Sequence, residues 1–267
     1  MLTKYKAVFS LGIISSMEYR LDYFVSLFGA MFPIMIQVFL WIAIYGGSQD
    51  KELYGYKFPQ MIAYIVIAAF VNRMVNTEVE NVINDDIHSG GIAKYLIKPI
   101  GYITFRMLYL LGQKLSSVIT ILLFSFGAIA FLHRTVGLEI YYAHILLFIP
   151  ALLLGLILNF FIFFIISMLA FWLTEVGSFF MTVQVIITVI SGGVFPITIM
   201  GDTFVTIMKY LPFIYTTYFP AQLLTGAILT PDIRAGMGLQ MFWICLLSFI
   251  SVLLWRAGSK RYVAVGG

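Results

Sequence analysis

The sequence predicts an all-α membrane protein with six transmembrane helices. Hydrophobic residues make up 61% of the 267 positions and charged residues 10%, whereas soluble domains have about 45–50% and about 25%. Six apolar segments of roughly 18 residues or more run along the chain, and each is long enough for a helix to cross the hydrocarbon core. These observations leave no length for a soluble catalytic domain.

The N-terminal segment, residues 1–21, predicts an amphipathic helix at the membrane surface. Its apolar residues recur at i, i+4 spacing, at Tyr5, Phe9, Ile13, Met17 and Leu21. A cleaved signal peptide is the alternative, but Glu18 interrupts the apolar stretch and no small-residue cleavage site follows. We therefore expect a retained surface helix.

The six apolar segments that follow set the orientation of the chain. They cover residues 23–45, 58–76, 115–132, 142–170, 179–200 and 239–255. Six spans place both termini on one side, and if that side is the cytoplasm, 11 of the 16 lysines and arginines lie inside and 5 outside. The positive-inside rule therefore predicts cytoplasmic termini.

Residues 78–101, between the second and third spans, stand out as a polar segment in this apolar chain. Val82, Ile83 and Ile87 form one apolar stripe, while Glu80 and Asp85 occupy other faces. The pattern predicts a short cytoplasmic helix that ends at a glycine pair, Gly90 and Gly91.

Residues 191–232, after the fifth span, are apolar but contain four prolines and several glycines. The prolines are Pro196, Pro212, Pro220 and Pro231. One continuous helix cannot accommodate so many breakers, and irregular backbone at membrane depth occurs only where protein or a water-filled cavity covers it. We expect short broken or re-entrant helices at the outer face.

Several kinds of chemistry are excluded or disfavoured. No stretch fits a phosphate-binding loop, so the chain cannot hydrolyse ATP by itself, and it is not predicted to be an enzyme. The three histidines lie apart, and Cys245 is the single cysteine, so we expect no metal or cofactor on this chain. The net charge of +4 is attributed to membrane orientation rather than to nucleic-acid binding.

Few polar residues lie inside the predicted spans. Four of them are candidates for a substrate pathway: Gln37, Asn72, Asn76 and Gln184. Hydrogen bonds between helices are the favoured interpretation, and substrate contact is the alternative. Because the spans contain almost no titratable group, we expect the energy for transport to come from another polypeptide.

Two motifs carry a resemblance to a known family. The first is "ISGGVFPITIMGDTFVTIMKYLPFIYTTYFPAQLLTGAI", with Ser-Gly-Gly, Pro, Leu-Pro-Phe and Tyr-x-Pro elements in order, and the second is "DDIHSGGIAKYLIKPI". Through them nearly the whole chain resembles the membrane subunits of ATP-binding-cassette transporters of the type-two exporter superfamily. Where many relatives have a second Phe-Pro, this chain reads Ile199-Met200-Gly201-Asp202.

The resemblance implies a half-transporter in the cell membrane, taken as the bacterial cytoplasmic membrane. Two permease chains, identical or homologous, would each bind a separately encoded cytoplasmic ATPase, and ATP and Mg would be bound by that partner. The loop over residues 78–101 would hold the coupling helix that docks on the ATPase, with a solvated connector as the alternative. The residues assigned to this contact are Glu80, Val82, Ile83, Asp85, Asp86, Ile87, Gly90 and Gly91.

The resemblance also assigns the outer region a gating role. The residues concerned are Ser191, Gly192, Gly193, Phe195, Pro196, Pro212 and Pro220, with Phe195 and Pro196 as an apolar gate. A nucleophile loop at Ser191 is the competing interpretation, but no base lies at comparable depth. The expected function is export of amphipathic or lipophilic cargo such as a drug, a peptide or a lipid-linked molecule. The alternatives are a stand-alone channel or secondary transporter, and an enzyme that acts on lipid.

Overall fold

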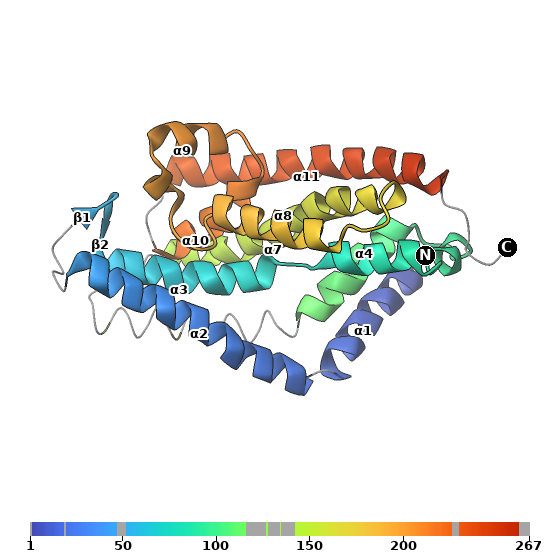
Figure 1. Ribbon diagram of the computed structural model, residues 1–267, viewed down its shortest axis with the longest axis horizontal. Coiled ribbons are helices and arrows are strands. Elements are labelled where there is room, and N and C mark those ends of the chain that lie inside the picture. The colour runs from blue at the N-terminus through green and yellow to red at the C-terminus, as the bar shows by residue number, and fades with distance from the viewer. Residues whose placement is uncertain are drawn as a thin grey trace.

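A computed structural model describes residues 2–18, 20–46, 52–115, 127, 134, 142–225 and 230–261. Helices form almost all of the described chain, as the sequence predicts (Figure 1). The longer helices are α1 (Leu2–Glu18), α2 (Arg20–Tyr45), α3 (Phe58–Val75), α4 (Val79–His88), residues 102–115, α7 (Tyr142–Ser167), α8 (Gly177–Ile190) and α11 (Thr230–Ser259). The shorter ones are α5 (Ala93–Leu96), η1 (Met168–Phe171), η2 (Ile197–Met200), α9 (Asp202–Met208), η3 (Phe213–Tyr215) and α10 (Tyr218–Thr225).

The long helices α3, α7 and α11 run along the long axis of the molecule, and α2 is tilted against them (Figure 1). The strands β1 (Glu52–Leu53) and β2 (Tyr56–Lys57) and the helix α9 lie at one end, which we call the hairpin end. The helix α4, the start of α1 and the end of α11 lie toward the other, which we call the α4 end. The first and last described helices therefore share one end of the molecule.

Three described helical segments are long and apolar enough to cross a membrane. They are Phe58–His88, Leu146–Phe171 and Asp232–Ser259, and the shorter apolar helices are Met31–Tyr45 and Gly177–Ile190. The predicted third span, residues 115–132, lies outside the described residues except for Leu115 and Gly127. The chain is thus a multi-pass membrane protein, and the count of six spans stays a prediction.

The predicted fifth span is shorter than expected. Helix α8 ends at Ile190, ten residues before the predicted end at Met200. Its 14 residues reach about 21 Å, less than the roughly 30 Å hydrocarbon core. Gly192, with a φ of +78°, turns the chain directly after the helix. The short helices η2, α9, η3 and α10 follow, and α10 packs against α3 and α7.

A backbone break separates α3 from α4. Helix α3 ends at Val75, and Glu78 has a φ of +48°, which places it in the left-handed region. The Lys114 ammonium donates hydrogen bonds to the carbonyl oxygens of Arg73, at 3.3 Å, and Asn76. A cation at a helix C-terminus satisfies carbonyls that have no partner within the helix. Lys114 therefore stabilises the end of α3 where the chain changes direction.

The hairpin between α2 and α3 is the one element type that the sequence did not predict. Tyr54 and Gly55 both have positive φ, at 55° and 81°, and Glu52 pairs with Lys57. Positive φ at both central residues defines the type I′ turn that joins tightly paired strands. Two-residue strands are too short to leave an alternating pattern in the sequence.

Two hydrophobic clusters form the core, and α7 contributes to both. The larger cluster begins at α4 and the helix over residues 102–115, contains Ile83, Phe164 and Phe180, and extends along α7, α8 and α11 to α10. The cluster at the hairpin end joins α2, α3, α7 and α10 and contains Tyr45 and Met61. The long helix α7 thus connects the two ends of the molecule.

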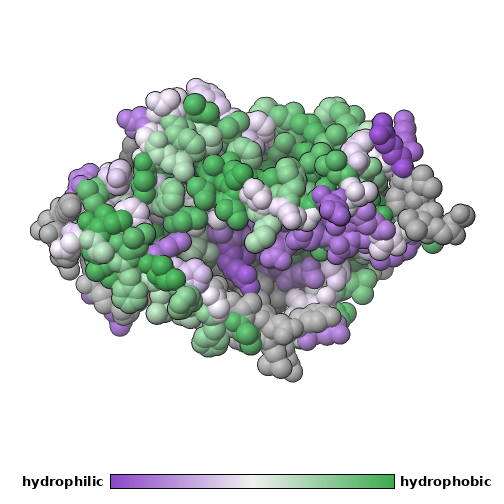
Figure 2. Space-filling view, viewed as in Figure 1, coloured by the Kyte–Doolittle hydropathy of each residue, from purple (hydrophilic) through white to green (hydrophobic). Residues whose placement is uncertain are grey.

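Large hydrophobic side chains also cover much of the surface. Phe28 on α2, Met181 on α8 and Phe249 on α11 are 74%, 70% and 62% exposed. Figure 2 shows hydrophobic residues over α8 and α11, while hydrophilic residues gather toward the position of α4. Such apolar surfaces are expected where a protein contacts lipid or another chain within the membrane.

Candidate coupling helix and the outer turn

Helix α4 has one buried face and one exposed face. Ile83 is fully buried and Ile87 is 7% exposed, whereas Val82 is 44% exposed. The exposed side chains follow one another at helical spacing: Asn81, Val82, Asp85, His88 and Ser89. The buried face packs against α7, η1 and α8.

This arrangement corrects part of the docking surface expected from the sequence. Val82 and Asp85 are exposed, but the other apolar and acidic residues assigned to a partner are buried inside their own chain: Glu80, Ile83, Asp86 and Ile87. An apolar stripe packs on whichever hydrophobic surface lies nearest, and α7 and α8 provide that surface here. The face left for a partner is therefore mostly polar.

Asp86 takes part in a buried ion pair. Its Oδ2 accepts hydrogen bonds from the Arg106 guanidinium and, at 2.5 Å, from the Tyr102 hydroxyl. Arg106 Nε donates to the Tyr102 oxygen at 3.2 Å, and Lys94 Nζ lies 3.9 Å from Asp86 Oδ1. Asp86 and Arg106 are 7% and 9% exposed. The pair joins α4 to the helix over residues 102–115.

The surroundings affect the protonation of this cluster. Burial lowers the pKa of Arg106 to about 10, which still leaves the guanidinium charged at neutral pH. Burial raises the pKa of the Tyr102 phenol, so the hydroxyl keeps the proton that it donates to Asp86. The site therefore contains a full positive charge and a neutral donor around one carboxylate.

Aromatic rings extend the contact to the end of α11. The Tyr102 and Trp255 rings stack with centroids 4.5 Å apart, and Trp255 also meets Phe171 edge-on at 5.8 Å. The Tyr95 ring lies 5.1 Å from that of Tyr102. We call Asp86, Arg106, Tyr102, Tyr95 and Trp255 the Asp86 cluster. It brings α4, α5, the helix over residues 102–115 and the end of α11 together.

The glycine pair after α4 permits a close return of the chain. Helix α4 ends at His88, and Gly90 adopts a φ of +78°. A methyl group on Gly91 would lie 2.9 Å from Asp86 Oδ1, and the Ile92 N–H donates to the Asp86 carbonyl at 3.1 Å. Gly91 thus leaves space for the carboxylate that Arg106 binds.

Helix α1 crosses the helix over residues 102–115 at two glycines. A methyl group on Gly12 would lie 2.2 Å from the Tyr109 carbonyl oxygen, and Gly112 meets α1 as closely. Val8 is buried, whereas Tyr5 and Met17 are 39% and 62% exposed. The buried face of α1, which contains Val8, is therefore adjacent to the face formed by the predicted apolar stripe. That α1 lies at the membrane surface stays a prediction.

At the hairpin end, residues 191–193 form a tight turn rather than a reactive loop. Tyr64 donates its hydroxyl proton to the Gly192 carbonyl at 2.7 Å, and a methyl group on Gly192 would lie 2.7 Å from the Tyr64 oxygen. A methyl group on Gly193 would lie 3.1 Å from Asn72 Oδ1. Ser191 is 1% exposed, and its hydroxyl donates to the Thr188 carbonyl at 3.1 Å. The motif allows the turn after α8 to approach Tyr64 and Asn72 of α3 closely.

Hydrogen bonds between neutral polar groups also join the helices at the hairpin end. Gln222 Nε2 donates to the Tyr56 hydroxyl at 3.0 Å and to the Tyr218 hydroxyl, and the Tyr218 N–H donates to the Ser191 carbonyl at 2.9 Å. We call Tyr56, Tyr64, Tyr218 and Gln222 the tyrosine cluster. It contains no charged side chain.

The residues predicted to gate the outer side belong to this packed region. Pro196, Pro212 and Pro220 are buried, and Phe195 is partly buried against the core at the hairpin end. Pro220 lies on the buried face of α10. Their packing is structural here, and a gating role stays a prediction.

The four predicted pathway residues are half-buried: Gln37 lies on α2, Gln184 on α8, and Asn72 and Asn76 on α3 and at its C-terminal end. Asn72 contacts the turn at Gly193, and Asn76 lies at the end of α3. Gln37 Oε1 and Asn76 Oδ1 are buried without a hydrogen-bond partner in the described part of the chain. No hydrogen bond between described residues joins Gln37 or Gln184 to Asn72, so the structure does not gather the four into one site.

Sequence reasoning missed Arg106, Tyr102 and Lys114. The only sequence signal is the spacing of Tyr102 and Arg106, which are four residues apart and therefore share one helix face. Asp86 lies 20 residues from Arg106, and no local pattern predicts that the two would meet.

Comparison with known proteins gives the class of the chain. A family model described as ABC-2 family transporter protein matches residues 31–266, which include every described helix from α3 to α11. No curated protein sequence matches the chain. Because the family model covers most of the sequence, and because the described helices are those of a multi-pass membrane protein, the chain belongs to the ABC-2 transporter family and is a membrane permease of that type.

Proposed function

We propose that this permease forms half of a transmembrane export pathway, together with a second copy or a homologous permease. A separately encoded cytoplasmic ATPase binds ATP and Mg and drives transport. The α4 end faces the cytoplasm, with both termini on that side, in agreement with the distribution of lysines and arginines. Family membership supports an ATPase partner in general, and the ATPase itself is part of the proposal.

The observation that carries the proposal is the exposed face of α4. Val82, Asp85 and His88 are exposed, while the opposite face of the same helix is held by the buried pair of Asp86 and Arg106. A helix that transmits motion must be firmly attached to the spans that it moves, and the Asp86 cluster supplies this attachment. A solvated connector would not require a buried ion pair.

The charge of the exposed face indicates the chemistry of the partner. Asp85 is the exposed carboxylate of α4, since Glu80 and Asp86 are buried. A carboxylate at the rim of an interface favours a basic partner surface and affects the rate of association. We therefore infer that the ATPase presents lysine or arginine to Asp85, with an apolar contact at Val82.

The cargo is amphipathic or lipophilic. The described spans expose large apolar side chains, among them Phe32, Phe39 and Met181, and a pathway between two copies would be lined by such residues. Phe195 and Pro196 would close the outer side of that pathway. ATP binding would bring the two ATPases together, move α1 and α4 with them, and open the pathway outward.

The Asp85→Lys variant tests the docking role. Purification of the tagged permease from its native host should recover at least about fivefold less ATPase with this variant, because a repulsive charge replaces an attractive one. Asp202→Lys is the matched control, since Asp202 is an exposed acid on α9 near the hairpin end. Unchanged recovery with Asp85→Lys would contradict docking at α4.

A second experiment addresses the need for an ATPase. The purified permease, reconstituted alone in vesicles, should not move a lipophilic fluorescent dye across the membrane. Transport in this preparation would contradict the proposal and would favour a stand-alone channel or a secondary transporter.

A further inference from the structure

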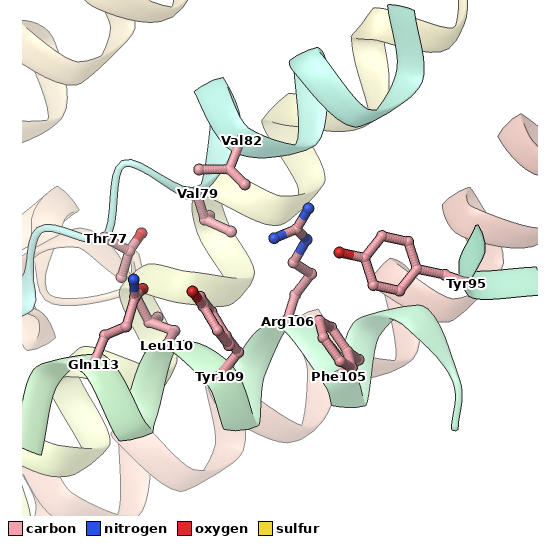
Figure 3. A pocket seen from close by; sticks show the side chains of 9 residues that line it. All are labelled: Thr77, Val79, Val82, Tyr95, Phe105, Arg106, Tyr109, Leu110 and Gln113. Atoms are coloured by element: carbon pink, nitrogen blue, oxygen red, sulfur yellow. The ribbon is translucent and has the colours of Figure 1, made fainter. Parts of the chain in front are cut away.

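A cavity of about 350 Å³ lies between the start of α4 and the helix over residues 102–115 (Figure 3). It is lined by Thr77, Val79, Val82, Tyr95, Phe105, Arg106, Tyr109, Leu110 and Gln113. The volume is within the roughly 300–1,000 Å³ range of small-molecule sites. It is large enough for a polar headgroup but not for two acyl chains.

The cavity wall combines apolar and polar groups. Val79, Val82 and Leu110 supply the apolar part, and Figure 3 shows the Arg106 guanidinium between α4 and the Tyr95 hydroxyl. Arg106 uses Nε and one terminal nitrogen for Tyr102 and Asp86. Its other terminal nitrogen, Nη1, has no hydrogen bond to a described residue and so can donate to a ligand oxygen.

Two lysines add positive charge beside the aromatic wall of the cavity. Lys98 Nζ lies 4.6 Å from the centre of the Tyr95 ring and 4.9 Å from that of Phe105, both of which line the cavity. Lys94 Nζ lies 5.1 Å from the centre of the Tyr95 ring. Of these cations, Arg106 is bound to Asp86, and Lys94 lies 3.9 Å from the same carboxylate. Three cations thus lie around Asp86 on this side of the cavity, while the exposed acids Glu78 and Asp85 lie next to and one turn from lining residues of α4.

We propose that this cavity binds the phosphate of an anionic phospholipid of the cytoplasmic leaflet, while the acyl chains stay in the bilayer. The inference rests on the proposed orientation, in which the α4 end faces the cytoplasm. Basic pockets between helices on that side attract anionic headgroups, and each lysine or arginine near the surface strengthens the attraction. Arg106 donates to a phosphate oxygen, and Val79 and Leu110 contact the glycerol backbone.

The location gives the lipid a structural role. Val82 lines the cavity and lies on the exposed face of α4. Arg106 also lines the cavity and belongs to the Asp86 cluster. A bound headgroup would therefore contact the docking helix and its anchor at once. Lipid occupancy would stabilise the position of α4 relative to the helix over residues 102–115.

Native mass spectrometry of the full chain in detergent tests the proposal. Phosphatidylglycerol and phosphatidylcholine with the same acyl chains are added to delipidated protein, and retained lipid is counted. We expect at least about fivefold tighter binding of phosphatidylglycerol. Val82→Trp, which fills the cavity and leaves the ion pair intact, should lower that binding at least about tenfold, and each of Lys94→Gln and Lys98→Gln should lower it by about fivefold.

Met181→Trp is the matched control, because it adds the same side chain at an exposed position on α8. It should bind phosphatidylglycerol as the unmodified chain does, and thermal unfolding should show that both tryptophan variants are folded. Equal binding of the two lipids, or full binding by Val82→Trp, would overturn the proposal. Glycerol 3-phosphate is the probe for a soluble phosphate: binding as tight as that of the lipid would overturn the lipid assignment.

The assay contains no ATPase, so its result is separate from that of the docking experiment. Failure of lipid binding leaves the effect of Asp85→Lys unchanged. Conversely, if Asp85→Lys left the recovery of ATPase unchanged, phosphatidylglycerol should still bind in the cavity.

Discussion

The two ends of the molecule hold their helices together by different interactions. At the α4 end, a buried ion pair between Asp86 and Arg106 joins α4 to the helix over residues 102–115. At the hairpin end, Tyr64 binds a backbone carbonyl of the turn at Gly192, and neutral amide and hydroxyl groups complete the contact. One end thus depends on charge, and the other on close backbone approach.

The difference shows how each end responds to a lost group. A buried charge left without its partner is costly, because desolvation is no longer offset, whereas a neutral donor can be lost at smaller cost. We therefore expect substitutions in the Asp86 cluster to destabilise the protein more than substitutions at the hairpin end. The Asp86 cluster also lies beside the exposed face of α4, where a firm attachment matters for the proposed ATPase contact.

The largest effect is expected from Arg106→Ala. This change leaves Asp86 buried and unpaired, which should lower the free energy of unfolding by about 3–5 kcal/mol. Thermal unfolding in detergent, followed by circular dichroism, measures the loss. The double variant Asp86→Asn/Arg106→Gln should recover much of it, and Arg256→Ala, at an exposed position of α11, should have little effect. A small effect of Arg106→Ala would mean that the pair does not hold this end.

A smaller loss is expected from Gly192→Ala at the hairpin end. The new methyl group would overlap the Tyr64 oxygen at 2.7 Å, and the φ of +78° is unfavourable for alanine. Together these should cost about 2–3 kcal/mol. Gly238→Ala is the control, because its methyl group meets nothing within 4 Å and lies in α11. The control should be neutral or slightly stabilising, and equal behaviour of the two variants would argue against a tight turn at residue 192.

The most direct comparison removes one hydroxyl from each end. Tyr102→Phe deletes a hydrogen bond to a charged acceptor and should cost about 2 kcal/mol, whereas Tyr64→Phe deletes one to a neutral carbonyl and should cost about 1 kcal/mol. Both losses are measured as shifts in unfolding temperature under the same detergent conditions. A larger shift for Tyr64→Phe would reverse the ranking of the two ends.

Much of the fold follows from patterns that are local in the sequence. The apolar segments predict α2, α3, α7 and α11, although α11 begins nine residues before the predicted start at Leu239. The polar segment over residues 78–101 predicts the short helix that the structure shows as α4, because its charged residues recur on faces away from the apolar stripe. Helix propensity and hydrophobic length act within one segment, so no tertiary contact is needed to predict these elements.

The candidate site was less accessible to sequence reasoning. The stripe of Ile83 and Ile87 predicts that one face of α4 is buried, but not by which surface. The resemblance to type-two exporters assigned Asp86 to the ATPase contact. Arg106 binds it instead, from a helix that lies close only after the chain has folded.

The sequence by itself determined that this is an all-α membrane protein, that residues 78–101 form a polar break between spans, and that residues 191–232 do not form one continuous helix. Composition, period and motif carry this information, because each acts over a few neighbouring residues. Only the tertiary structure decided that Asp86 binds Arg106, that Asp85 is the exposed acid of α4, and that a cavity opens beside Val82. A carboxylate can bind water, another protein or its own chain, and the packing of distant helices selects among them.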